Sequence, residues 1–119
     1  MAVIFIRDLL LRTEVGFNPH ELGKKQDVLL NIAIHYRLRG EESSDNPEEA
    51  LNYRTLCKGI VNLVEKERFN LLEMLVNKVA DYLLLNERIL SVEVTADKPH
   101  ALRFARSVAF SLEKKREID

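Results

Sequence analysis

The sequence predicts an α+β fold in which a four-stranded antiparallel sheet carries two helices on one face. Two observations support this prediction. Apolar residues alternate with polar ones in stretches at both ends of the chain, and stretches with helical spacing lie between them. The order is strand, strand, helix, helix, strand, strand, so two hairpins form the sheet. We expect residues 1–119 to form a single domain, because 119 residues is the usual size of one domain.

The first strand is expected over residues 3–15, where apolar side chains occur at both parities and a bulge would account for the broken alternation. A turn at residues 16–19 follows it. Residues 26–37 form the clearest strand, because apolar side chains alternate regularly along it. Residues 41–49 contain five acids and no basic residue, which predicts a solvated loop that leads into a helix.

The first helix is expected near residues 55–67, where apolar side chains recur at helical spacing. The second helix is predicted to begin at Asn70, with Asn70 as the N-cap and Glu73 as its capping-box partner. Residues 91–96 and 104–112 alternate again and form the last two strands.

The predicted strands are long for a chain of this size. Several approach 10–12 residues, against roughly 5–6 for a typical strand. Long open strands leave unpaired edges and an uncovered second face, which favour aggregation in a monomer. We therefore expect a homo-oligomer in which edges pair between copies and close a ring.

Composition excludes several classes of function. Lys and Arg number 18 and Asp and Glu 19, so the chain lacks the basic surplus of a nucleic-acid-binding protein. One cysteine, Cys57, and three dispersed histidines give no metal-ligand spacing, and no glycine-rich phosphate loop occurs. No apolar run approaches the ~20 residues of a membrane span. We expect a cytoplasmic protein without a metal, a cofactor, or a nucleic-acid or membrane partner.

Four side chains that could carry chemistry lie at or near the ends of predicted elements, where sites often occur. They are Glu21, Tyr53, Glu73 and Lys98. Each also has a purely structural interpretation: a loop acid, a half-buried aromatic, a capping-box residue and a solvated turn lysine. Composition and spacing alone leave all four unassigned.

Six short stretches, taken together and in order, are more specific. They are Val15-Gly16-Phe17 with Glu21, Gln26-Asp27-Val28, Leu51-Asn52-Tyr53, Glu65 with Arg68-Phe69, Leu72-Glu73, and Lys98-Pro99. With these stretches the chain resembles the dihydroneopterin aldolase family over nearly its whole length. The resemblance implies the tunnelling fold and a homo-octamer of two stacked tetrameric rings. It also implies a pterin substrate bound at subunit interfaces, and no cofactor.

Within that family the chain is similar to the branch of dihydroneopterin triphosphate 2′-epimerases, through residues 34–36, 51–55, 71–73, 100–105 and 107–108, although Pro99 is aldolase-like. This implies epimerisation at C2′ of 7,8-dihydroneopterin 3′-triphosphate, giving 7,8-dihydromonapterin 3′-triphosphate. The alternatives are a dihydroneopterin aldolase of folate biosynthesis, which releases glycolaldehyde and 6-hydroxymethyl-7,8-dihydropterin, and a non-catalytic pterin-binding oligomer. The presence of all the matched polar residues argues against the last.

The resemblance also implies roles for individual residues. Lys98, Tyr53 and Glu21 match catalytic positions, with Tyr53 supplied by a neighbouring subunit. Glu73 matches the carboxylate that holds the pterin, next to Leu72. Cations for the triphosphate are expected among residues that flank the matched positions: His100, Arg103 and Arg54, with Lys58 and Arg106 as further candidates.

Overall fold

The computed structural model describes residues 1–117. Its elements, in chain order, are β1 (Ala2–Val15), β2 (Gln26–Tyr36), α1 (Glu41–Ser44), the 3₁₀ turn η1 (Pro47–Glu49), α2 (Tyr53–Glu65), β3 (Arg68–Phe69), α3 (Leu72–Leu84), β4 (Ile89–Pro99) and β5 (Ser107–Lys115). The strands form one sheet in the order β3-β1-β2-β4-β5. The long strands are all antiparallel to their neighbours, as the sequence predicts.

The sheet has five strands and not the four that were predicted. The additional strand, β3, pairs Arg68 and Phe69 in parallel with Glu14 and Val15 at the end of β1. A strand of two residues contains no alternation that a sequence pattern could reveal. The fold class itself is confirmed: an α+β tunnelling fold.

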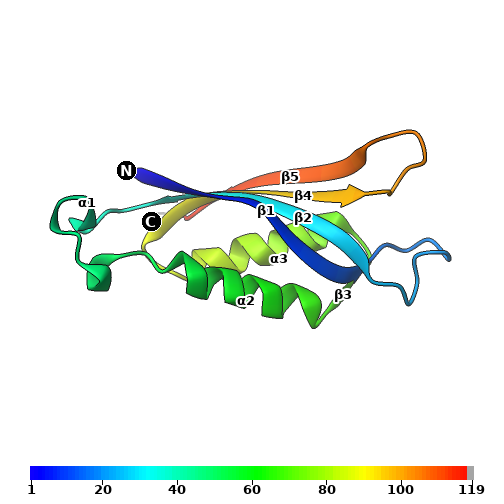
Figure 1. Ribbon diagram of the computed structural model, residues 1–119, viewed down its shortest axis with the longest axis horizontal. Coiled ribbons are helices and arrows are strands. Elements are labelled where there is room, and N and C mark those ends of the chain that lie inside the picture. Colours follow the sequence, from blue (N-terminus) through cyan, green and yellow to red (C-terminus); the bar gives the residue numbers. More distant parts are fainter. Residues whose placement is uncertain (118–119) are drawn as a thin grey trace.

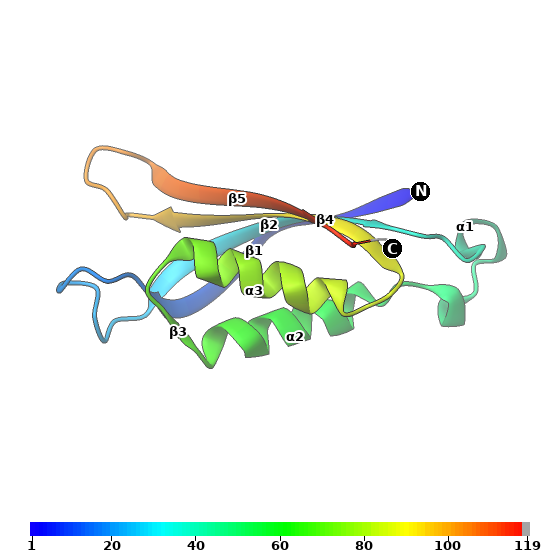
Figure 2. The ribbon, with the colours of Figure 1, turned by 180° about the vertical axis from the view of Figure 1, so that it is seen from behind.

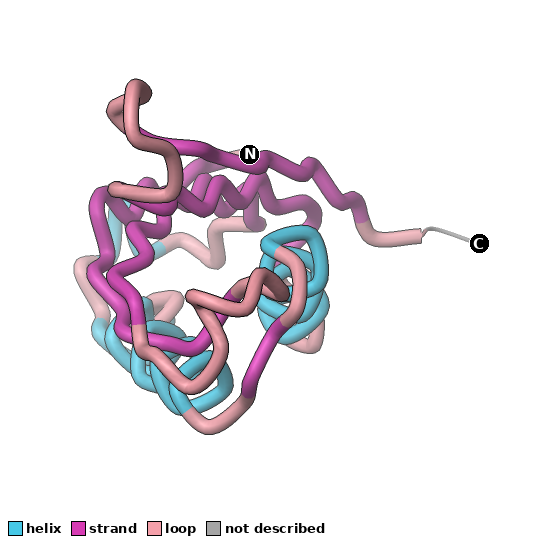
Figure 3. Tube along the Cα trace, turned by 90° about the vertical axis from the view of Figure 1, so that its right-hand side faces the viewer, coloured by secondary structure: helices cyan, strands magenta, loops and turns pink. Residues whose placement is uncertain are grey.

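Helices α2 and α3 both lie against one face of the sheet (Figures 1 and 2). Seen end-on, the sheet curls over the helix pair (Figure 3). The core between them is built from buried aliphatic side chains, among them Leu30 and Ile34 of β2, Ile60 of α2, and Val76 and Val79 of α3. Burial of these apolar surfaces is what holds the helices on the sheet.

A bulge in β1 explains why apolar residues occur at both parities of that strand. The β1–β2 register shifts between Ile6 and Leu9, and Asp8 has a positive φ of 54°. Asn31 holds the bulge, because its side chain accepts from the Asp8 amide at 3.0 Å and donates to the Asp8 carboxylate at 3.2 Å. Residues 4 and 6 therefore face the helices before the bulge, and residues 9 and 11 face them after it.

Three local predictions are wrong. The acidic segment 41–49 contains α1 and η1, although a loop was expected. Leu71 is the N-cap of α3, so there is no capping box: Glu73 is the second helical residue, and the Asn70 side chain accepts from Arg68 at 2.8 Å. The last strand begins at residue 107, and Phe104 lies in the preceding loop with 95% of its surface exposed.

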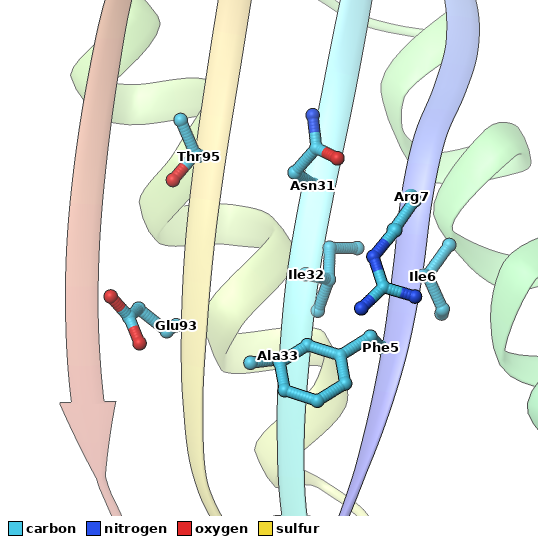
Figure 4. Close-up of a pocket in the computed structure, with 8 residues that line it drawn as sticks. All are labelled: Phe5, Ile6, Arg7, Asn31, Ile32, Ala33, Glu93 and Thr95. Atoms are coloured by element: carbon cyan, nitrogen blue, oxygen red, sulfur yellow. The ribbon is translucent and has the colours of Figure 1, made fainter.

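Within residues 1–117, the other face of the sheet carries no helix. Figure 4 shows side chains of this region: Phe5, Arg7 and Glu93 are exposed on the open face, whereas Ile6 and Ile32 pack toward the helices. The Arg7 guanidinium lies 4.9 Å from the centre of the Phe5 ring. A shallow hollow of about 310 Å³ lies there, and none of the predicted site residues lines it. No helix within residues 1–117 has the length and apolar character needed to cross a membrane.

Candidate active site

Four of the predicted site residues meet at one end of the molecule. A cavity of about 160 Å³ is lined by Glu21, Leu72, Glu73 and Lys98. Glu21 comes from the loop after β1, Leu72 and Glu73 begin α3, and Lys98 lies at the end of β4. This is the end at which β3 joins β1, on the right in Figure 1. Sheet pairing thus brings together residues that are up to 77 positions apart.

Glu21 and Lys98 form a buried ion pair. The Lys98 Nζ lies 2.5 Å from Glu21 Oε2, and each side chain is 10% exposed. Gln26 Nε2 donates to the same oxygen at 3.1 Å, and Asn18 Nδ2 donates to Oε1 at 2.9 Å. The Lys98 hydrogen bond, helped by those of Gln26 and Asn18, outweighs burial and lowers the pKa of Glu21 to about 2. The Glu21 carboxylate is therefore ionised near neutral pH, and these hydrogen bonds fix its position beside Lys98.

Gly16 provides the space for this carboxylate. Its φ is +136°, and a Cβ at this position would lie 2.4 Å from Glu21 Cδ. Any side chain here would push Glu21 away from Lys98. The Gly16 amide donates to the Phe69 carbonyl at 2.9 Å, so the short β3 fixes the start of the loop that carries Glu21.

Glu73 presents a different carboxylate. It is exposed, and among residues 1–117 no hydrogen-bond donor or cation contacts it. Its place in the first turn of α3 puts it at the positive end of the helix dipole. Two free carboxylate oxygens can accept a pair of parallel N–H donors, such as an amidine-like ring edge. Leu72 beside it is buried and forms an apolar part of the cavity wall.

A second, smaller cavity adjoins the first. Its volume is about 90 Å³, and the two cavities share Glu21 and Ala101 in their walls. The basic groups in this second cavity are His20, Lys24 and His100. Of these, only His100 was predicted as a site residue. His20 and Lys24 lie in a loop without periodicity, so no sequence signal places them near His100.

Other predicted residues lie elsewhere. Tyr53 and Arg54 begin α2, at the end of that helix away from β3. A helix of 13 residues is about 20 Å long, so they lie far from Lys98 within one chain. Tyr53 is 56% exposed. Arg103, in the exposed loop before β5, has its guanidinium 5.5 Å from the Phe104 ring centre and lines neither cavity.

Lys58, on α2, and Arg106, beside β5, also line neither of these cavities. Residues 1–117 contain no group of three histidine, cysteine or acidic side chains that could hold a metal ion. What converges at this end is therefore a free carboxylate, an ion-paired lysine and a set of basic side chains. Such a set suits proton transfer on, and hydrogen bonding to, a polar organic ligand.

The fold is that of a tunnelling-fold protein, and its candidate site lies at the β4–α3 end of the sheet. A profile of the FolB dihydroneopterin aldolase family matches residues 4–113. The chain belongs to the dihydroneopterin aldolase family.

Three known proteins place the chain within that family. The dihydroneopterin triphosphate 2′-epimerase of Pseudomonas aeruginosa is 45% identical over 94% of this chain and 91% of its own length. The Escherichia coli protein of the same name is 41% identical over 93% and 92%. The crystal structure of Escherichia coli dihydroneopterin aldolase in complex with neopterin superposes with a TM-score of 0.90 at 28% identity, covering 96% of this chain and 99% of that one.

Proposed function

We propose that the protein is a dihydroneopterin triphosphate 2′-epimerase, which converts 7,8-dihydroneopterin 3′-triphosphate into 7,8-dihydromonapterin 3′-triphosphate. One observation carries the proposal: Glu73 and the Glu21–Lys98 pair face one cavity. Identities of 45% and 41% to proteins named as epimerases, against 28% to an aldolase, favour this branch over aldol cleavage as the main activity.

In this proposal Glu73 holds the ring. Its carboxylate accepts from the 2-amino group and the adjacent ring N–H, two parallel charge-assisted hydrogen bonds that fix the pterin in one orientation. The free carboxylate and its place in the first turn of α3 suit this role. With the ring so fixed, the reacting side chain at C6 points away from Glu73, toward Lys98 and Glu21. Such positioning is itself a large part of catalysis.

In the proposed reaction the substrate itself accepts the electron pair, at its C6=N5 imine. Removing the proton of the 2′-hydroxyl lets the C1′–C2′ bond break, so that C2′ becomes an aldehyde. The bonding pair moves into the C6=N5 imine, and N5 takes up a proton. The aldehyde then turns over and C1′ attacks its other face. N5 loses its proton, the 2′-oxygen regains one, and C2′ is inverted. If the aldehyde leaves before this step, the products are those of an aldolase.

Lys98 is the proton donor to N5, directly or through one water molecule, and its ion pair with Glu21 keeps it in place. Glu21 orders water or a side-chain hydroxyl beside that lysine. Tyr53 handles the 2′-hydroxyl proton, and it must come from another copy of the chain, because its own α2 places it at the far end.

The small size of the cavity at Lys98 indicates that one chain forms only part of the site. Small-molecule pockets usually measure roughly 300–1,000 Å³, and the cavity at Lys98 measures about 160 Å³. We propose that a neighbouring copy supplies the remaining wall and Tyr53, in a ring of four chains that stacks on a second ring to form an octamer.

The proposal is tested by incubating the protein with dihydroneopterin triphosphate and, separately, with dihydroneopterin. We expect the monapterin epimer to be the dominant product from the triphosphate. Lys98→Ala and Glu73→Gln should reduce kcat/KM by a factor of 100 or more, on the scale typical of a positioned acid–base group. Lys66→Ala and Glu87→Gln change exposed residues outside both cavities and are the matched controls. Dominant 6-hydroxymethyl product would make the protein an aldolase instead.

A further inference from the structure

We infer that the smaller cavity, walled by His20, Lys24 and His100, binds the triphosphate of the substrate. The inference rests on the proposed function and identifies which part of the chain recognises the phosphates. The sequence points to Arg54, Arg103 and His100 for this task, and of these only His100 lines the cavity beside Glu21.

The position of the cavity is the first argument. Glu73 lines only the larger cavity, and the three basic groups line only the smaller one. Glu21 and Ala101 form the wall that the two share. A pterin held by Glu73 at its 2-amino edge has its C6 side chain at the opposite end of the ring. That side chain passes Glu21, and the phosphates at its far end reach the smaller cavity.

The chemistry of the walls is the second argument. The Lys24 ammonium is a cationic donor, and an imidazole carries at least one N–H that can donate to a phosphate oxygen. Glu21 would repel an anion if it were unpaired, but its charge is matched by Lys98 and its oxygens are occupied by Asn18 and Gln26. The cavity therefore presents donors, and its one acid is already neutralised.

The backbone at His100 is the third argument. His100 has a positive φ of 70° directly after Pro99, at the end of β4. A non-glycine residue in this region costs free energy and is common at ligand sites. This conformation places His100 in the wall of the smaller cavity, two residues from Lys98. By contrast, Arg54 lies at the start of α2, at the other end of the chain.

The test compares KM for dihydroneopterin triphosphate with KM for dihydroneopterin. In Lys24→Ala the ratio of KM for the triphosphate to KM for dihydroneopterin should rise about tenfold, the effect of losing one charge-assisted hydrogen bond. The double variant His20→Gln/His100→Gln should raise it by a similar factor, and Lys24→Arg should keep it near the wild-type value. The matched control is Lys25→Ala, which removes the neighbouring lysine that lines neither cavity and should leave the ratio unchanged.

Inorganic tripolyphosphate provides a second measurement that does not depend on turnover. Calorimetric titration should detect its binding to the wild type and a loss of about tenfold in affinity in Lys24→Ala. If the wild type acts on neither pterin, the proposed function fails, and this titration alone decides the inference. If the protein epimerises the triphosphate but neither the ratio nor tripolyphosphate affinity changes in these variants, the inference is wrong and the function stands. The inference would also be wrong if the KM ratio rose in Arg103→Glu but in none of the Lys24 and histidine variants.

Discussion

At the scale of single residues, the Glu21–Lys98 pair is the central feature of the candidate site. Taking two charges out of water is costly, and Coulombic attraction offsets that cost only with good geometry and further hydrogen bonds. Here Gln26 and Asn18 supply those hydrogen bonds, and the glycine at position 16 leaves space for the carboxylate. This arrangement holds the lysine nitrogen at one point beside the cavity, as a positioned proton donor requires.

Glu21→Gln is the first prediction at this scale. At pH 7 the change should lower the free energy of unfolding by about 3 kcal/mol, because it leaves Lys98 as a buried, unpaired charge. The pKa of Glu21 is lowered from 4.5 to about 2 in the folded chain, so the pair stabilises the fold above pH 4.5. This stabilisation is lost as the pH falls toward 2. Chemical denaturation of both proteins from pH 7 to pH 2 should therefore show the difference shrinking.

The control for this prediction is Glu87→Gln, which removes an exposed acid outside the two cavities. It should follow the wild-type pH profile throughout. A difference between wild type and Glu21→Gln that stays constant down to pH 2 would contradict the lowered pKa.

At the scale of elements, Arg88 ties the segment before α2 to the sheet. Its side chain is 5% exposed and forms an ion pair with Glu41 of α1. It also donates to the carbonyls of Arg37 and Glu49 at 2.6 Å each, and stacks 5.4 Å from the Tyr36 ring centre. One guanidinium thus fixes α1 and η1, the segment that leads into Tyr53.

We predict that Arg88→Met destabilises the fold by about 3 kcal/mol, because it leaves a partly buried carboxylate and two carbonyls without their donor. Arg88→Lys should recover only part of the loss, since an ammonium cannot reach all three acceptors in the planar geometry of a guanidinium. Denaturant unfolding measures the loss. Hydrogen exchange in residues 41–50 should rise more than in β2. Equal stability of Arg88→Lys and the wild type would contradict the role of the planar guanidinium.

Whether the sequence predicts an element depends on the length of that element. Strands and helices of nine residues or more were predictable, because apolar periodicity needs several repeats to be distinct. The two-residue β3 has no such pattern. The capping box predicted at Asn70 does not form, because the Asn70 side chain accepts a hydrogen bond from Arg68 instead. Glu21, Glu73 and Lys98 could be predicted as site residues only by resemblance, and their meeting depends on contacts across 77 positions. His20, Lys24 and Arg88 had no signal at all.

At the scale of the whole molecule, the residues of the proposed site lie at opposite ends of one chain. Lys98 and Glu73 lie at the β4–α3 end, and Tyr53 lies at the start of α2, along a molecule whose longest dimension is 52 Å. Within residues 1–117, neither the outer edge of β5 nor most of the outer edge of β1 pairs with another strand. Such unpaired edges are where copies can pair, and the proposed site requires an assembly that brings Tyr53 of one chain to Lys98 of another.

Shared sites of this kind allow two inactive variants to restore activity. Tyr53→Phe and Lys98→Ala should each be impaired alone. After dissociation and reassembly of an equal mixture, about a quarter of the interface sites should combine an intact Tyr53 from one chain with an intact Lys98 from the other, as random pairing of two subunit types requires. Epimerisation of dihydroneopterin triphosphate by the reassembled mixture measures the recovery.

The matched control is a mixture of Glu73→Gln and Lys98→Ala. Glu73 and Lys98 face the same cavity of one chain, so every site in this mixture lacks one of them, however the chains assort. No activity should return. Recovery in both mixtures would mean that these residues also act across chains, and recovery in neither, with exchange verified by labelled subunits, would place Tyr53 outside the site. Recovery in the first mixture alone requires a site built from two copies, because no single chain in that mixture contains both residues.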